Sequence, residues 1–212
     1  MTPLLKTMPL APYLRSTEFI DHAHPSIIAK ADELTQGCQT DLETTQRCFE
    51  FVRDEVKHSG DFKLNPVTIR ASDVLTHGTG YCYAKSHLLA ALLRSKGIPT
   101  GLCYQRLAVN PGRGPFCLHG LNAVHLKDHG WYRLDPRGNK PGVCAQFTPP
   151  VEQLAFALQL PQECDFPEIW PDPLPVVIES LSSAGSVEEF FNHYPDIEIT
   201  QPATGLTGTQ RA

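Results

Sequence analysis

Hydrophobic residues recur at helical spacing in the amino-terminal part of the chain. Thr40 and Glu43 form a capping-box pattern, and apolar residues follow at intervals of three and four as far as about Lys57. This pattern predicts a helix over that stretch. Pro25 suits the first turn of an earlier helix, which we expect over Ser26–Thr35.

A longer apolar pattern runs from about Cys82 to Lys96. Its hydrophobic residues cover a wide face, which predicts a helix that is buried on more than one side. Gly97 fits the position just after the helix, and Pro99 prevents its continuation. A short glycine-containing segment, residues 77–80, leads into this helix.

After residue 100 the hydrophobic period changes from that of a helix to that of a strand. We expect a strand at Leu102–Val109 and a hairpin of two strands, Phe116–Leu126 and Trp131–Leu134, joined across residues 127–130. Helices followed by antiparallel strands predict an α+β fold in which the helices pack against one side of the sheet.

The carboxyl-terminal part is rich in proline, with seven between residues 149 and 175. We expect an ordered wrap around the core with one helix, Val151–Leu160. Ser186 and Glu189 form another capping-box pattern before a short helix that ends at Tyr194. Because the chain has no internal repeat, we expect a single domain over residues 1–198. Within it we expect a core at 13–145 and a proline-rich wrap at 146–198, and after it a disordered tail at 199–212.

Composition narrows the classes of function. The 212 residues carry a formal net charge of −5 and no cluster of Lys and Arg, which argues against a nucleic-acid partner. The amino terminus lacks the unbroken apolar run of an export signal, and no run is long enough for a transmembrane helix. We therefore expect a cytoplasmic protein without membrane contact, whose seven cysteines are reduced thiols.

One cysteine stands where its position favours chemistry. Cys82 begins the most apolar predicted helix, directly after the glycine-containing segment. Unpaired backbone N–H groups in the first turn of a helix favour a negative charge, so they stabilise a thiolate, the nucleophilic form of cysteine. Gly78 and Gly80 allow a substrate to approach the backbone closely. We therefore take Cys82 as the candidate nucleophile.

A cysteine nucleophile needs a base and a group that orients the base. The predicted hairpin supplies both, because His119 lies on its first strand and Asp135 follows its second, and folding across residues 127–130 makes them neighbours. His125 is the main rival for the base, although it lies close to the turn, and His129 lies in the turn itself. His87 follows the cysteine by five residues, which does not place it on the same helix face.

Several segments together form a specific pattern. They are Ala71-Ser72-Asp73-Val74-Leu75, Gly80-Tyr81-Cys82-Tyr83-Ala84-Lys85, Leu88–Leu93 with Arg94 and Gly97-Ile98-Pro99, and His119 with Trp131-Tyr132-Arg133-Leu134-Asp135-Pro136. Over about residues 13–145 this pattern resembles the bacterial transglutaminase-like superfamily. The resemblance implies a papain-like α+β fold. It also implies a catalytic triad of Cys82 as nucleophile, His119 as general base and acid, and Asp135 as the orienting group.

The chemistry that the resemblance implies is acyl transfer. Cys82 is expected to attack an amide of a peptide, protein or small amide substrate, and the resulting thioester passes its acyl group to water or to an amine. The oxyanion would be met by the backbone N–H of Cys82 and a second donor, for which backbone groups just before the cysteine and the His77 ring are candidates. Leu121, Ala123 and Tyr83 depart from residues common in the family, and these differences concern the substrate-binding surface.

Two alternatives were compared with this hypothesis. The remaining cysteines and histidines do not have zinc-site spacing, except for His125 and His129, which span a turn, so we expect no metal and no other cofactor. The second alternative is a catalytically inactive transglutaminase-like binding or scaffold domain. The spacing of the triad favours the enzyme, because a scaffold does not need a nucleophile paired with a base. The sequence does not predict the oligomeric state.

Overall fold

The computed structural model of the protein describes residues 9–110 and 112–197, so the predicted disordered tail lies outside the described residues. The helices are η1 (Ala11–Leu14), α1 (Pro25–Leu34), α2 (Asp41–Glu50), η2 (Phe51–Glu55), α3 (Ser59–Phe62), α4 (Ala71–His77), α5 (Cys82–Ser95), α6 (Pro175–Ser183) and α7 (Val187–Phe190). The strands are β1 (Lys57–His58), β2 (Thr79–Gly80), β3 (Thr100–Asn110), β4 (Arg113–Leu126), β5 (Gly130–Leu134) and β6 (Cys164–Asp165).

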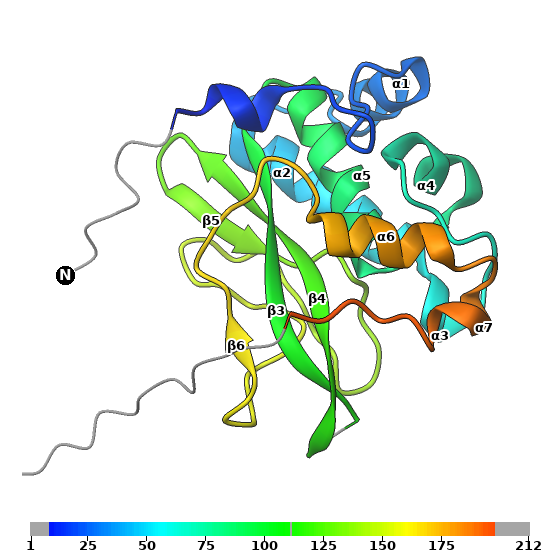
Figure 1. The fold of residues 1–212 in the computed structure, drawn as a ribbon. Coiled ribbons are helices and arrows are strands. Elements are labelled where there is room, and N and C mark those ends of the chain that lie inside the picture. Colours follow the sequence, from blue (N-terminus) through cyan, green and yellow to red (C-terminus); the bar gives the residue numbers. More distant parts are fainter. Residues whose placement is uncertain (1–8, 111, 198–212) are drawn as a thin grey trace, which may run out of the picture.

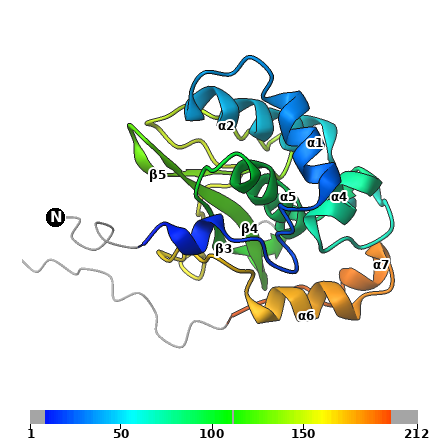
Figure 2. The ribbon, with the colours of Figure 1, turned by 90° about the horizontal axis from the view of Figure 1, so that it is seen from above.

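The main sheet has four antiparallel strands in the order β5-β4-β3-β6, and the helices gather mainly on one side of it (Figure 1). The central helix is α5, which packs directly on β3 and β4 while α1, α2 and α4 cover its other side (Figure 2). Every residue from Cys82 to Arg94 is buried. The predicted α+β fold is therefore confirmed, and so is the prediction that this helix is buried on more than one side.

The capping box at the start of α2 has the expected hydrogen bonds. The Thr40 hydroxyl accepts from the backbone N–H of Glu43 at 3.1 Å, and the Glu43 carboxylate accepts from the backbone N–H of Thr40 at 3.3 Å. The helix is not regular as far as Lys57, because it ends at Glu50 and continues as the π-helix η2. Beyond α5, Gly97 has a φ of 76°, the left-handed conformation that favours glycine after a helix.

The prediction of a helix at Val151–Leu160 is wrong. The segment is irregular, and the backbone N–H of Ala155 donates to the Asp135 carboxylate at 3.1 Å instead of to a carbonyl one turn earlier. A helix that the prediction omitted, α6, begins at Pro175 as its first residue. The short helix after Ser186 is confirmed as α7, although it ends at Phe190 and not at Tyr194, and the Ser186 hydroxyl accepts from the backbone N–H of Glu189.

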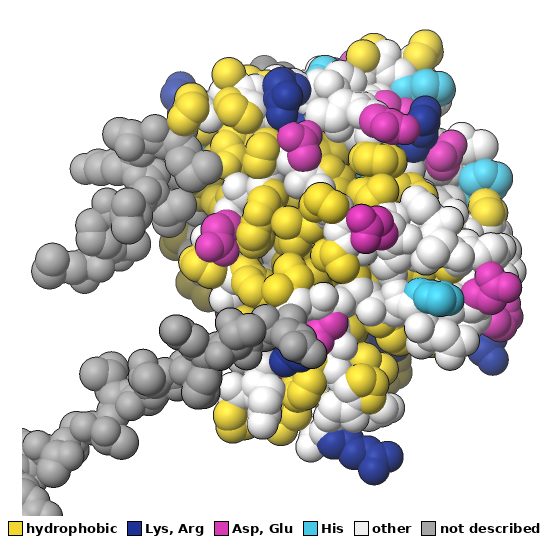
Figure 3. Space-filling model, viewed as in Figure 1, with side chains coloured by type: hydrophobic (Ala, Val, Ile, Leu, Met, Phe, Trp, Pro, Cys, Tyr) yellow, Lys and Arg dark blue, Asp and Glu magenta, His cyan; other side chains and the backbone are white. Residues whose placement is uncertain are grey.

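The face of the molecule in Figure 3 carries hydrophobic side chains around the segment that precedes α6, where Phe166, Trp170 and Leu174 are partly buried against the core. Lys and Arg side chains on this face are scattered and form no continuous basic area (Figure 3). None of the helices in the described residues combines the length and hydropathy needed to span a bilayer.

Candidate active site

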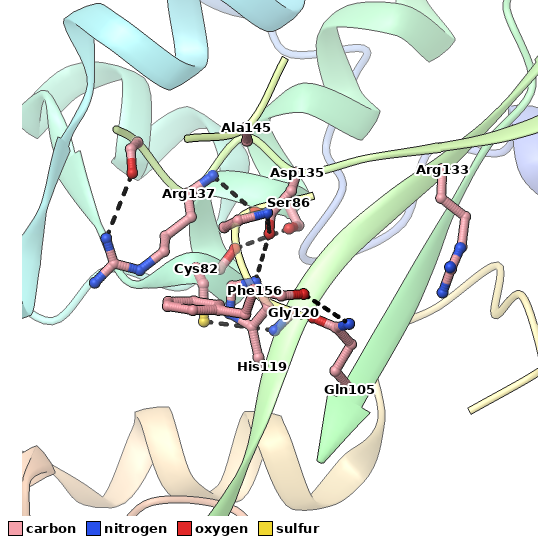
Figure 4. Close-up of polar contacts among 12 residues, drawn as sticks. Cys82, Ser86, Gln105, His119, Gly120, Arg133, Asp135, Arg137, Ala145 and Phe156 are labelled. Atoms are coloured by element: carbon pink, nitrogen blue, oxygen red, sulfur yellow. Dashed lines mark hydrogen bonds and ion pairs between the residues drawn. The ribbon is translucent and has the colours of Figure 1, made fainter. Parts of the chain in front are cut away.

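Helix α5 and strand β4 bring the candidate nucleophile to the centre of the molecule. Cys82 is the first residue of α5 and is only 7% exposed. Opposite it, Gly120 on β4 has no side chain, and a Cβ atom there would lie 2.9 Å from the Tyr83 ring and 3.1 Å from the Tyr83 Cα. This close packing places the backbone N–H of Gly120 3.5 Å from the Cys82 Sγ, to which it donates (Figure 4).

The hairpin of β4 and β5 brings His119 and Asp135 together. The register pairs Asn122 with Leu134, so Asp135 leaves β5 beside the part of β4 that carries His119. The imidazole Nε2 lies 2.7 Å from the Asp135 Oδ2, and both residues are buried (Figure 4). Because Nε2 is hydrogen-bonded to Asp135, the other ring nitrogen, Nδ1, is the one available to interact with the Cys82 sulfur.

The charges of the site keep His119 protonated. Burial opposes the charged imidazole, but the Asp135 carboxylate and the Cys82 sulfur, through their charges and hydrogen bonds, outweigh it and raise the pKa of His119 to about 10. The arrangement therefore favours an imidazolium beside the sulfur at neutral pH. An imidazolium in this position stabilises a thiolate, the form of cysteine that attacks carbonyl carbon.

Two backbone groups fix the Asp135 carboxylate besides His119. The N–H of Arg137 donates to Oδ1 and the N–H of Ala155 donates to Oδ2, each at 3.1 Å. Burial raises the pKa of Asp135, but the charge of His119 and these hydrogen bonds lower it more, and the net shift is downward. The carboxylate thus stays ionised although it is fully buried.

The irregular segment after β5 covers the histidine. The ring of Phe156 meets the His119 ring edge to face, with the centroids 5.0 Å apart. Gln105, which is paired with His119 across β3 and β4, donates to the Phe156 carbonyl at 3.5 Å and to Asp165 at 2.9 Å. This cover limits the freedom of the imidazole to rotate.

A cavity of about 510 Å³ lies between α5, β4 and the irregular segment that contains Phe156. Cys82 and His119 line it, together with Tyr83, His58 and Phe156. No group of three or more His, Cys, Asp or Glu side chains in the described part of the chain is arranged to hold a metal ion.

The other histidines lie elsewhere. His125 packs against Trp131 with ring centroids 5.4 Å apart, and His87 is hydrogen-bonded to the Ile69 carbonyl at 2.8 Å. His77 is exposed at the end of α4 and does not line the cavity, so its ring is not placed to be the second oxyanion donor. The structure therefore brings Cys82 and His119 together and leaves the rival His125 outside.

Comparison with known proteins shows the family to which the chain belongs. The family model described as the transglutaminase-like superfamily matches residues 28–136, just over half of the chain. The chain belongs to the transglutaminase-like superfamily. No curated protein sequence matches the chain significantly.

Solved structures resemble this transglutaminase-like chain at low sequence identity. A proposed cysteine protease from Cytophaga hutchinsonii is 17% identical with a TM-score of 0.50, and the match covers 64% of this chain and 45% of that one. The periplasmic domain of TgpA from Pseudomonas aeruginosa is 20% identical with a TM-score of 0.46, over 61% of this chain and 48% of that one. This transglutaminase-like chain thus spans less than half the length of either structure. The first of these supports the fold.

Sequence reasoning missed several residues of this transglutaminase-like site. Gly120 directly follows the candidate histidine, and a glycine inside a strand is a known sign of close backbone approach. Phe156 carried no such sign, because it reaches the cavity from a segment that the sequence assigned to a helix, and His58 carried none either. Arg137 follows Asp135 by two residues, but its side chain has a partner, Asp61, that is 76 residues away in the sequence.

Proposed function

We propose that this member of the transglutaminase-like superfamily is a cysteine-dependent acyl-transfer enzyme that acts on amide bonds. Cys82 is the nucleophile, and His119 is the general base and acid. Asp135 orients the imidazole and stabilises its protonated form. The observation that carries the proposal is the buried 2.7 Å contact of Asp135 with His119, which lines the same cavity as Cys82.

The reaction proceeds in two halves. In the first, the Cys82 sulfur forms a bond to the amide carbonyl carbon, and the bond from that carbon to nitrogen breaks. The His119 imidazolium gives its proton to the departing nitrogen. In the second half, water or an amine attacks the thioester, gives a proton back to His119, and releases the thiolate.

The surroundings support each role. Gly120 donates a backbone hydrogen bond to the sulfur, and the first turn of α5 favours negative charge at Cys82. The Asp135 carboxylate remains ionised and holds the ring by one nitrogen. The Phe156 ring limits the motion of the imidazole. A non-catalytic scaffold has no need for such a pairing of nucleophile, base and orienting carboxylate.

The test is a screen of amide and glutaminyl peptides, each with and without an added primary amine, read by mass spectrometry. We expect turnover by the wild-type protein and none by Cys82→Ser or His119→Ala. His125→Ala is the matched control, because His125 lies on the same strand, packs against Trp131 and does not line the cavity. Full turnover by Cys82→Ser or His119→Ala in a folded protein would refute the proposal.

The same screen separates hydrolysis from transamidation. Hydrolysis releases an acid whether or not the amine is present. Transamidation gives an amine adduct that grows with amine concentration. Access of water to the thioester determines which product forms.

A further inference from the structure

One end of the active-site cavity carries two cationic side chains that share a single carboxylate. The Arg137 guanidinium donates to both Asp61 oxygens at 2.8 and 3.1 Å, and the Lys140 ammonium donates to the Oδ1 of Asp61 at 2.6 Å. All three residues line the cavity. Burial opposes the charged carboxylate, but its hydrogen bonds to the two cations prevail and lower the pKa of Asp61 to about 2. The cluster therefore carries a net positive charge at neutral pH.

This cluster lies a short distance from the candidate catalytic histidine. The Arg137 guanidinium carbon is 5.4 Å from the centre of the Phe156 ring, and that ring centre is 5.0 Å from the centre of the His119 ring (Figure 4). The guanidinium is thus no more than about 10 Å from the imidazole. An extended peptide advances about 3.3–3.6 Å per residue, so this span corresponds to roughly three residues.

Both cations have donors left over. The Nη1 and Nη2 atoms of Arg137 face Asp61, and no acceptor among the described residues takes its Nε–H. A guanidinium presents its N–H groups in pairs that match the two oxygens of a carboxylate. The Lys140 side chain is 43% exposed and has three donors, of which Asp61 takes one. An incoming carboxylate therefore finds unused donors on both side chains.

The two ends of the cavity differ in charge. Glu163 lies beside β6, on the other side of β3 and β4 from α3, which carries Asp61 (Figure 1). The Glu163 carboxylate accepts from the backbone N–H groups of Ala108, Gln159 and Leu160. It repels a substrate anion from that end. At the Arg137 end, burial and the charge of Arg137 hold the pKa of His58 well below its ordinary value, so His58 is uncharged there.

We propose that Arg137 and Lys140 form a subsite for a carboxylate of the substrate. The substrate is then a peptide or small amide whose carboxylate lies within about three residues of the amide that Cys82 attacks. This inference rests on the proposed function, because it names the substrate class of the same site. The carboxylate belongs either to an acidic side chain or to the end of a peptide, and the test separates the two.

The probes are short Gly and Ala peptides around a central glutamine. One series places Asp or Asn at each of the first three positions on either side, and a second series ends in a free acid or a carboxamide. Binding to the Cys82→Ala protein is measured by calorimetry, and turnover by the wild-type protein by mass spectrometry. We expect the carboxylate member of at least one pair to bind about tenfold more tightly. Its KM should fall by a similar factor with little change in kcat.

Variants locate the effect. Lys140→Met should reduce the preference for carboxylate severalfold without changing binding of the uncharged member, and Lys140→Arg should retain it. Lys127→Met removes the same charge from the exposed turn between β4 and β5 and should change nothing. Arg137→Gln, checked for folding by circular dichroism, should lose the preference.

The outcomes distinguish failure of the subsite proposal from failure of the proposed function. Equal binding of both members of every pair, absence of binding by all of them, or a preference that is undiminished in Lys140→Met would overturn the subsite. Turnover of both members at equal KM would overturn the subsite and support the proposed function. Carboxylate-selective binding that depends on Lys140, without turnover of any probe, would support the subsite and count against the proposed function.

Discussion

Replacing Asp135 by asparagine removes one charge from the most buried polar group of the site. Three N–H donors point at this carboxylate: the His119 Nε2 at 2.7 Å and the backbone groups of Arg137 and Ala155 at 3.1 Å each. An asparagine has one acceptor oxygen, and its NH2 group must then face at least one of these donors. The substitution therefore loses the charge and also leaves a buried N–H without an acceptor.

Two magnitudes follow for Asp135→Asn. A buried donor left without a partner costs about 1–3 kcal/mol of unfolding free energy. In a chain of this size that lowers the Tm by roughly 2–12 °C. Turnover should fall further than stability implies, by about 10²–10⁴-fold, because the imidazole loses the carboxylate that stabilises its charged form.

The assay is alkylation of Cys82 by iodoacetamide between pH 5 and pH 9, with peptide mapping to separate this thiol from the other six. In the wild-type protein the pKa of His119 is raised to about 10, so the imidazole beside the sulfur keeps its charge over this range, and we expect the rate at pH 6 to stay close to that at pH 8.5. Without Asp135, the largest charge that raises the pKa of His119 is gone. The rate at pH 6 should then fall about tenfold or more.

The control is Asp172→Asn, which removes a carboxylate from a half-exposed ion pair with Arg15. It should leave both the alkylation profile and turnover unchanged. An alkylation profile for Asp135→Asn that coincides with that of the wild-type protein, in a protein shown to be folded, would refute the reasoning about the charge of His119.

The other predictions concern packing and pH. Gly120→Ala pushes β4 away from Tyr83, and calorimetry should show a loss of about 1–3 kcal/mol in the free energy of unfolding. Gly185→Ala should lose little, because its Cβ meets only the flexible side chain of Glu189. Equal losses in the two variants would contradict the packing argument. Lys85 is buried under the site, and burial lowers its pKa to about 7 although its ammonium donates to the Val56 carbonyl. The unfolded chain therefore binds more protons between pH 7 and pH 10.5, so stability from this group rises with pH. The free energy of unfolding of the wild-type protein minus that of Lys85→Met, measured by denaturation, should rise by up to about 1.4 kcal/mol per pH unit from pH 7 to pH 9. A value that stays constant or falls over this range would be inconsistent with a lowered pKa of Lys85.

Local signals predicted much of the fold. The capping box of Thr40 and Glu43 marks the start of α2, and the apolar run after Cys82 marks the buried helix. Both depend on residues close together in the sequence, where spacing and end signals are informative. The hairpin of β4 and β5 followed from its turn, and its register makes His119 and Asp135 neighbours.

The parts that the sequence did not predict depend on distant partners. Residues 151–160 have an apolar composition that suits a helix, but the Asp135 carboxylate takes the Ala155 N–H, and the Phe156 ring packs on His119. The pairing of Arg137 with Asp61 joins the loop after β5 to α3, and neither residue indicates the other by spacing. Such contacts form only once the tertiary structure exists.

Acyl transfer through one cysteine can be tested without knowledge of the natural substrate. The protein is treated with p-nitrophenyl acetate, quenched in acid, and analysed by peptide mass spectrometry. We predict a rapid release of nitrophenol and an acetyl thioester on Cys82, both lost in His119→Ala and unchanged in His125→Ala. Acetyl groups spread over several cysteines, or an unmodified Cys82 in a protein that still releases nitrophenol, would contradict a nucleophilic role for this residue.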